Sequence, residues 1–444
     1  MPPPQSRRRV RFYGVGSKAA VIGAAVLAGI AVVVAGYRIR TALSRGPVLL
    51  RLGDDVPLGP VPPLSNDRDA QRYRLAALQR ALAQAQASDR AALWTALGGM
   101  ALQAGDPYAA QIALKRALRP DAANVTALER LGRAQVSLGL FQDAVSTWRA
   151  LIALEPGRPA GAIELSRTLT VLGRRSDAAA VLEKAEQTLS STDVAGRGAL
   201  IREYDRRGEL ARALQLSRNL VEAAPADPGA QFLLAMLLFK TQRLAEAEPL
   251  LERLVAGGSR QVQVRRYLAA VLLNPLSPHR DARRAEHLLL EAANLEPGDG
   301  GPLLDLATLY AEQGRARAAA HVLTRLLELS PTSATARLQL GHAFGHLGMR
   351  EAAQTQEELA RRLFARNREA EALRTQIDHR PTDASARLAF GLHFMRWGEF
   401  GRALPELEAA FCLSMYSSKA RNALSAYYRA LDLPPPSYLR GAPR

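Results

Sequence analysis

The sequence predicts an all-α protein, a solenoid of helix hairpins that follows one transmembrane helix near the N-terminus. Three observations support this. Alanine and leucine, both strong helix formers, supply most of the apolar residues, whereas aromatic residues make up only 5% of the chain. A pattern of small and apolar residues recurs about every 34 residues along most of the 444 residues. An uncharged run of 19 residues lies near the start.

The formal net charge of +17 is unevenly distributed. Residues 1–51 contain nine of the 59 basic residues and no acidic residue, which leaves 50 basic against 42 acidic residues in the remainder. The body is therefore only mildly basic, and its charge does not call for a nucleic-acid partner. The single cysteine, Cys412, excludes an intrachain disulfide and a thiolate metal cluster.

The predicted transmembrane helix is the apolar run at residues 19–37, AAVIGAAVLAGIAVVVAGY, which follows a basic tail at residues 1–18. As a helix it would span roughly 28 Å, close to the thickness of a bilayer's hydrocarbon core. A cleaved signal peptide and a buried core helix are the alternatives, but the run is long for the first and lacks the polar face of the second. Basic residues before it favour a cytoplasmic N-terminus in a bacterial inner membrane, with the body periplasmic.

Two segments are predicted to connect this helix to the body. Residues 38–66 are expected to form a spacer, because the stretch 46–66 holds five prolines and cannot form a long helix. Residues 67–90 are expected to form an N-terminal capping helix.

The body, residues 91–413, contains about nine copies of one spaced pattern. The second copy, LERLGRAQVSLGLFQDAVSTWRALIALEP, shows it in Gly132, Gly139, Ala144 and Pro156. Small residues at the first and third of these positions let two antiparallel helices approach closely. The glycine between them frees the turn, and the proline stops the second helix.

This spacing resembles the tetratricopeptide repeat family. The resemblance implies a right-handed α-solenoid whose stacked hairpins form a concave groove. It also implies protein binding as the class of activity, with no cofactor. Because solenoids need capped ends, residues 414–433 are expected to form a C-terminal capping helix, followed by a disordered tail at residues 434–444.

Two copies depart from the pattern. Copy six carries about four extra residues around NPLSPHRDA at 274–282, which predicts a longer turn between its helices. Copy eight lacks the closing proline, and its second helix is predicted to continue to about Gln376. That charged helix is expected to be a solvated brace or a partner-binding arm.

No catalytic or metal-binding constellation is present. The chain has no GxSxG, HExxH or complete Walker motif, so we do not predict an enzyme or a small-molecule substrate. His342 and His346 have a two-ligand spacing on one helix face, but the sequence places no third ligand beside them. Surface histidines are therefore the better interpretation.

In the family that the chain resembles, the first helix of each hairpin lines the groove through its positions 2, 5, 6, 9, 12 and 13. Position nine holds Arg133, Arg167 and Arg202 in copies two to four, whereas copies five and six supply apolar side chains. Such a groove suits an extended or helical peptide with acidic residues beside a hydrophobic anchor. The predicted groove residues are Glu129, Arg130, Arg133, Arg167, Arg202, Arg206, Phe232, Met236, Phe239, Tyr267 and Asn274.

The alternative for the arginines is that they are solvated, or paired with Glu129, Glu164 and Asp205. The groove hypothesis and the predicted anchor together indicate a membrane-bound scaffold or adaptor that gathers protein partners in an envelope-associated complex. One alternative is an accessory subunit for the synthesis or export of an envelope polysaccharide, which would need exposed aromatic residues. Another is an enzyme with a cryptic site, which would need a closed polar pocket.

Overall fold

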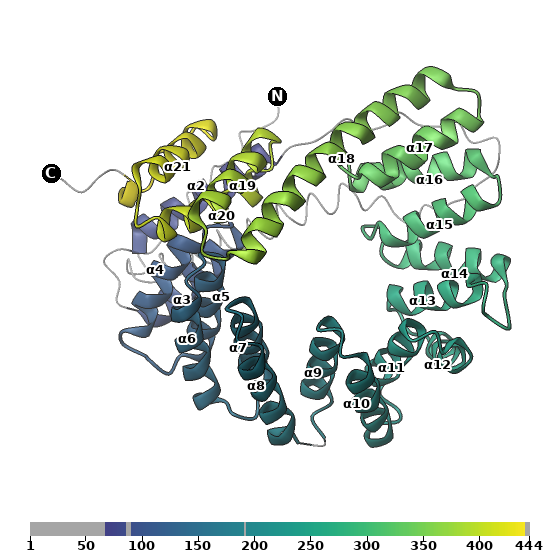
Figure 1. Cartoon of the computed structure of the whole chain (residues 1–444), viewed down its shortest axis with the longest axis horizontal. Helices are drawn as coiled ribbons and strands as arrows, with labels where there is room; N and C mark the ends of the chain where they lie inside the picture. Colours follow the sequence, from purple (N-terminus) through teal and green to yellow (C-terminus); the bar gives the residue numbers. More distant parts are fainter. Residues whose placement is uncertain (1–66, 86–89, 191, 440–444) are drawn as a thin grey trace, which may run out of the picture. The chain divides into compact units, whose positions relative to one another are not determined.

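The structure, a computed structural model, describes residues 67–85, 90–190 and 192–439 (Figure 1). The chain divides into two compact units, residues 1–45 and 46–444, and all that follows concerns the second. The predicted basic tail, transmembrane helix and spacer lie outside the described residues. Among the residues that are described, no helix is both long and apolar enough to cross a membrane.

All regular structure in the described part of the chain is helical. Helix α2 (Arg68–Ala85) comes first, then a series of antiparallel hairpins that lie side by side, then α21 (Ser418–Ala430) and a 3-10 helix, η1 (Ser437–Leu439). The hairpins are α3 (Ala91–Gln103) with α4 (Pro107–Leu118), α5 (Val125–Ser137) with α6 (Phe141–Leu154), α7 (Pro159–Val171) with α8 (Arg175–Thr188), α9 (Val194–Arg206) with α10 (Leu210–Ala223), α11 (Pro228–Lys240) with α12 (Leu244–Ala256), α13 (Val262–Leu273) with α14 (Ala282–Leu295), α15 (Gly301–Glu312) with α16 (Ala316–Leu329), α17 (Ala334–His346) with α18 (Arg350–His379), and α19 (Ala384–Arg396) with α20 (Phe400–Leu413).

The turn between the two helices of a hairpin requires left-handed backbone. Gly139 has φ +74°, and the N–H of the next residue, Leu140, bonds back to the carbonyl of Gln135 at 2.8 Å. Glycine adopts this conformation without steric cost, which explains its recurrence at the turn. In α11–α12, which lacks the glycine, Gln242 takes φ +59° in its place, and the longer turn between α13 and α14 has no left-handed residue.

The small residue in the first helix of each hairpin is required by close approach. A Cβ atom on Gly132 would lie 2.5 Å from the ring of Trp148, which is fully buried in α6. The contact of α5 with α6 therefore depends on the absence of a side chain at residue 132.

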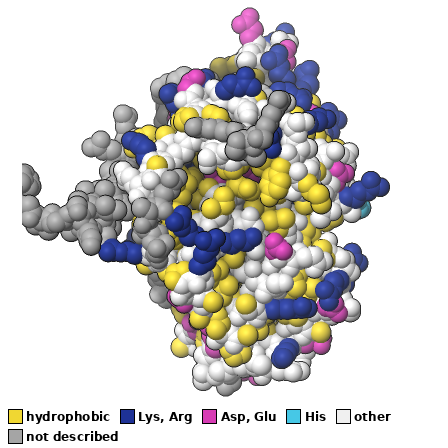
Figure 2. All heavy atoms as spheres, turned by 90° about the vertical axis from the view of Figure 1, so that its left-hand side faces the viewer, with side chains coloured by type: hydrophobic (Ala, Val, Ile, Leu, Met, Phe, Trp, Pro, Cys, Tyr) yellow, Lys and Arg dark blue, Asp and Glu magenta, His cyan; other side chains and the backbone are white. Residues whose placement is uncertain are grey.

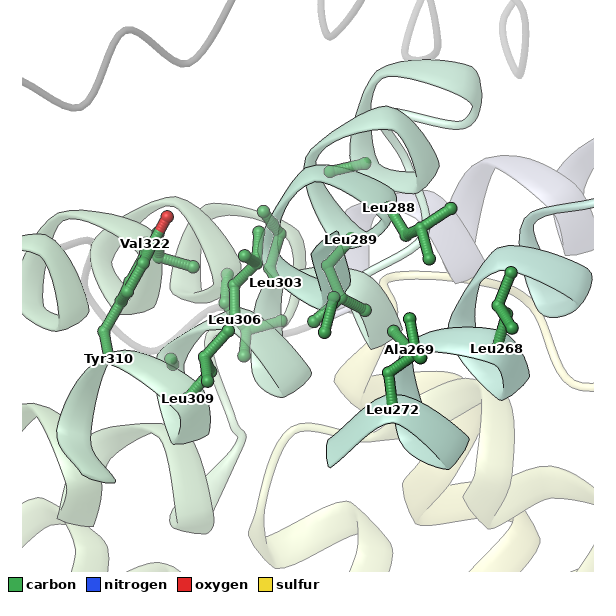
Figure 3. Packing of buried hydrophobic residues seen from close by; sticks show 14 of the residues in the cluster. Leu268, Ala269, Leu272, Leu288, Leu289, Leu303, Leu306, Leu309, Tyr310 and Val322 are labelled. Carbon is green, nitrogen blue, oxygen red and sulfur yellow. The ribbon is translucent and has the colours of Figure 1, made fainter. Parts of the chain in front are cut away.

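The interfaces between successive hairpins are mainly aliphatic. Leu268 and Leu272 of α13, Leu289 of α14 and Leu306 of α15 belong to one buried cluster (Figure 3). The cluster extends to Ala353, at the start of α18. Each hairpin thus buries its apolar side chains against its neighbours, as expected for a solenoid.

The long helix predicted in copy eight is confirmed: α18 has 30 residues and ends at His379, close to the predicted end. Ala353 at its beginning and Ile377 near its end belong to two different core clusters. Between them, Arg366 is buried and bonds to Glu399 at 2.7 Å. Both ends of the helix are thus packed in cores, which agrees with a brace.

The two ends of the array pack on each other, which the prediction of two separately capped ends did not anticipate. The carboxylate of Asp67 accepts hydrogen bonds from the N–H groups of Phe400 and Gly401, at 2.5 and 2.8 Å. Leu75 of α2 and Leu424 of α21 share one buried cluster with α3, α4 and α20. We call this region, formed by α2, α3 and α4 against α20, α21 and η1, the closure junction.

The predicted disordered tail, residues 434–444, is partly wrong. Tyr438 packs against Tyr108 with ring centroids 4.3 Å apart, and Leu439 is buried. Prolines that restrict the backbone lead into an aromatic and an apolar residue, so ordering this segment covers apolar surface. Residues 440–444 lie outside the described part of the chain.

Candidate partner-binding groove

A cavity of about 520 Å³ opens between α11, α13 and α15. Most of its lining residues occupy the positions of the first helix that were expected to face the groove. The lining residues are Phe239, Gln263, Arg266, Tyr267, Ala269, Ala270, Leu273, Asn274, Leu289, Asp305, Thr308, Leu309 and Glu312. We call this cavity the aromatic pocket.

Three aromatic side chains meet at this pocket. The ring of Tyr267 makes edge-to-face contacts with Phe232 and Phe239, at centroid distances of 5.6 and 5.4 Å. All three are partly buried and pack against the aliphatic core beneath them. Edge-to-face pairs restrain the rings, so the wall of the pocket is preorganised.

The rim of the aromatic pocket is polar. Arg266 binds Asp305 at 2.7 Å across α13 and α15. Asn274 accepts a hydrogen bond from the N–H of Leu276 at 2.9 Å, which fixes its side chain at the end of α13. Gln263 and Glu312 are exposed. An apolar floor with a few polar groups at its edge is suited to an apolar side chain whose backbone needs hydrogen bonds.

The predicted groove arginines, which we call the arginine ladder, lie on other hairpins than the aromatic pocket, and most of their charges are paired. They are Arg130, Arg133, Arg167, Arg202 and Arg206. Arg133 pairs with Glu129 at 2.5 Å, as the alternative interpretation expected. Arg130 donates to the carbonyl of Thr95 at 2.8 Å and lies against Gly99. These side chains therefore stabilise contacts within and between hairpins.

Glu203 holds two further arginines of the ladder. Its buried carboxylate accepts from Arg167 at 2.8 Å and from Arg206, and Arg167 also pairs with Glu164 at 3.0 Å. Asp205 instead binds Lys240 at 2.6 Å. A buried carboxylate needs such partners, because an unpaired charge in the interior is costly.

Arg202 differs from the other position-nine arginines. It is exposed, and it makes no ion pair with any residue that the structure describes. Met236 at the same position of the next hairpin is partly buried in a core cluster of α7 to α11. The structure therefore brings Phe232, Phe239 and Tyr267 together at one site, but not the arginines.

Glu203 could have been found from the repeat alignment. It occupies repeat position ten, which holds Ala134, Leu237 and Val271 in other copies. An acidic residue at a position that is apolar in most other copies indicates a buried carboxylate with charged partners. Arg266 and Asp305 fall at positions five and six, which the groove pattern includes.

A second cavity, of about 780 Å³, lies between α15, α16 and α17 and includes His342 and His346. Arg315 at its edge binds Glu286 at 2.8 Å. No group of three or more potential metal ligands occurs within the described ranges. The structure therefore offers these histidines no further protein ligand there.

Family profiles described as tetratricopeptide repeat match three segments of the chain. One profile matches residues 129–193 and 304–353, and another matches residues 206–270. These segments are therefore tetratricopeptide repeats, and they include most of the predicted groove. Both profiles describe repeats, and neither indicates a catalytic family.

Some solved structures are similar to the chain at low sequence identity. A crystal structure of MamA protein is 14% identical, with 40% of this chain and 96% of that chain covered and a TM-score of 0.35. A human IFIT1 dimer with PPP-AAAA is 15% identical, with 77% and 78% covered and a TM-score of 0.37. No curated protein matches the chain.

Proposed function

We propose that this chain is a protein-binding scaffold whose groove accepts an amphipathic segment of a partner protein. The observation that carries the proposal is the aromatic pocket: Phe239 and Tyr267 form an apolar wall beneath a rim that contains Asn274 and the Arg266–Asp305 pair. Open grooves of this kind bind extended or helical segments through apolar anchors and polar contacts to the backbone.

A single anchor would give modest affinity. Complete burial of one Leu or Phe side chain contributes about 1.5–3 kcal/mol. Association also costs translational and rotational freedom, so one pocket does not suffice for tight binding. We therefore expect a partner segment that contacts several hairpins, with the anchor in the aromatic pocket as its strongest contact.

We also propose that the partner carries an acidic residue, which would bind one arginine of the ladder rather than the whole row. Arg167 and Arg206 are bound to Glu203, so an incoming carboxylate would have to compete with a buried one. Arg202 is exposed and has no such competitor in the described part of the chain. It is the groove arginine that we expect to bind an acidic side chain.

We further propose that residues 19–37 anchor the chain in a bacterial inner membrane, with the repeats on the extracytoplasmic side of an envelope-associated complex. The support is the uncharged run itself and the basic residues before it. Protease added to spheroplasts should digest the repeats. Full protection in intact spheroplasts, with digestion after lysis, would reverse the topology.

Photocrosslinking in native membranes tests the groove. A photoreactive phenylalanine analogue at Phe239 should capture a defined set of proteins, identified by mass spectrometry. The substitution Tyr267→Ala should weaken that capture, because it removes the ring that packs on Phe239. The matched control is Tyr73→Ala on α2, where the tyrosine is 52% exposed. Equal capture by both variants would refute the pocket as the binding site.

A further inference from the structure

Two buried carboxyl groups meet where the ends of the array join. Asp106 precedes α4 in the first hairpin, and Glu408 lies within α20 in the last. Their exposed fractions are 4% and 0%. Where this side of the molecule is in view, its surface shows hydrophobic, basic and a few acidic side chains (Figure 2). Both carboxyls are buried.

Each carboxyl group is held by hydrogen bonds. Glu408 accepts from the N–H of Tyr108 and from the hydroxyl of Tyr438, both at 2.9 Å. Asp106 accepts from the N–H of Ala109 at 2.7 Å as the N-cap of α4. Tyr108 and Ala109 are successive residues of α4, so the two carboxyls lie close together at the N-terminus of that helix.

No basic side chain compensates the pair. Among the described residues, neither Asp106 nor Glu408 forms an ion pair with lysine, arginine or histidine. Burial raises the pKa values of Tyr427, Tyr428 and Tyr438, so these neighbours are uncharged near neutral pH. The titratable groups around the pair, taken from each adjoining element, are Asp67, Tyr108, Lys115, Cys412, Tyr416, Tyr427, Tyr428 and Tyr438.

Protonation of the pair is favoured by its surroundings. Burial, and then the charge of Asp106, raises the pKa of Glu408 well above its usual range. Burial likewise raises the pKa of Asp106. When the ends separate, water can solvate both groups, and their pKa values return toward ordinary values.

We propose that this pair makes closure of the array sensitive to pH, so that the two ends separate when both carboxyls are ionised. The sign follows from linkage. A carboxyl whose pKa is raised in the closed form stabilises closure at low pH, and this stability is lost as pH rises through the raised pKa. Ionisation of both groups leaves two negative charges close together without a cation, which favours opening.

Cys412 provides a probe that needs no engineering. It is the single cysteine of the chain and is partly buried on α20, one turn after Glu408. Burial raises the pKa of its thiol to about 12. Opening of the junction should expose this thiol and speed its reaction with a maleimide.

The experiment uses the full-length chain in a mild detergent, because residues 19–37 are apolar. The labelling rate of Cys412 is measured from pH 5 to pH 9. The labelling rate of the urea-unfolded chain at the same pH is then divided by this rate. This ratio, the protection factor, should fall as pH rises, by about tenfold for each unit of difference between the closed and open pKa values. Ionised Glu408 disfavours the thiolate and would raise protection, so it cannot imitate opening.

Two variants identify the pair as the cause. Glu408→Gln keeps the shape and should remove most of the pH dependence. Asp106→Asn should act similarly, because asparagine still caps α4 and carries no charge. Asp106→Asn also provides the test if Glu408→Gln does not fold. Glu248→Gln, a buried glutamate on α12, is the matched control and should retain the wild-type dependence. Equal pH dependence in the wild-type chain and in a folded pair variant would overturn the proposal.

Discussion

The interface between the hairpins α13–α14 and α15–α16 and the closure junction perform the same task with different residues. The first is built from leucine and alanine, such as Leu272, Leu289 and Leu306. The second contains aromatic rings and two buried carboxyls, Asp106 and Glu408. Both join hairpins, and both include directional contacts, such as Arg266–Asp305 at the first. Only the second of the two buries a pair of carboxyls without a basic partner.

The two interfaces differ because one kind recurs along the chain and the other occurs once. An aliphatic interface can be copied along the chain, because leucine packing needs only the right size and spacing. The junction occurs once and must bring together only the first and last hairpins. Polar groups that need particular partners can fix such a register, because a mismatched junction would leave buried carboxyls without hydrogen bonds. We infer that directional contacts give the junction its specificity.

The largest predicted effect breaks the aliphatic interface. Leu306 is fully buried, so Leu306→Ala should lower the free energy of unfolding by about 2–5 kcal/mol. Urea denaturation followed by circular dichroism measures the change. Leu392→Ala is the matched control, since Leu392 is 41% exposed on α19 and should cost far less. Similar losses for both variants would contradict the assignment of the core.

A second prediction concerns the buried ion pairs of the repeats. Arg167→Ala removes one partner of the buried Glu203, while Arg206 remains. We expect a loss of about 1.5–3 kcal/mol in the free energy of unfolding. Thermal and urea denaturation at neutral pH would measure it. A neutral effect would mean that Arg206 and water satisfy Glu203 alone.

The pH dependence of stability should distinguish the closure junction from the aliphatic interface. Because the pKa of Glu408 is raised by burial, its contribution is present at low pH and is lost as pH rises. The melting temperature of the wild-type chain should therefore fall, relative to that of Glu408→Gln, as pH rises above the range in which a glutamate ordinarily titrates. Each unit of pKa difference corresponds to about 1.4 kcal/mol. Leu306→Ala should shift both pH profiles without changing their difference.

A single hydrogen bond of the junction should have a smaller effect. Tyr427 donates to the carbonyl of Phe400 at 3.0 Å across α21 and α20. Tyr427→Phe keeps the ring and should cost about 1 kcal/mol. Hydrogen exchange should show the loss in α20 and α21 and leave α13 to α16 unchanged. Faster exchange throughout the array would mean that the junction is not a local unit.

The smallest predicted effect is at the unpaired groove arginine. Arg202→Ala should change the free energy of unfolding by less than about 0.5 kcal/mol, because the side chain is exposed and has no ion pair in the described ranges. The same variant should weaken capture of the partner. Stability measured beside Arg167→Ala separates a binding role from a structural one.

The repeating part of the fold could be predicted because most copies have small residues at the same positions. Gly139 supplies the left-handed turn and Gly132 the space for Trp148, so one hairpin explains its neighbours. The junction could not be predicted this way. Asp67 and Glu408 find their partners at the opposite end of the array, and no repeat position couples them.

The structure places the aromatic residues of the predicted groove together and pairs most of its arginines with acidic residues. Its aromatic residues fall together because Phe232, Phe239 and Tyr267 occupy facing positions on adjacent hairpins. The arginines also occupy groove positions, but Glu203 binds two of them. Pairing depends on rotamers and on distances between hairpins, which a repeat pattern does not specify.

The distance between the two ends in solution tests the closed array most directly. Arg68 on α2 and Asp432 after α21 are exposed and pair at 3.2 Å. Spin labels at these positions, in a full-length chain with Cys412→Ser, allow the distance to be measured by double electron–electron resonance. A closed array predicts one narrow, short distance at low pH. A broad distribution of long distances at every pH would contradict closure.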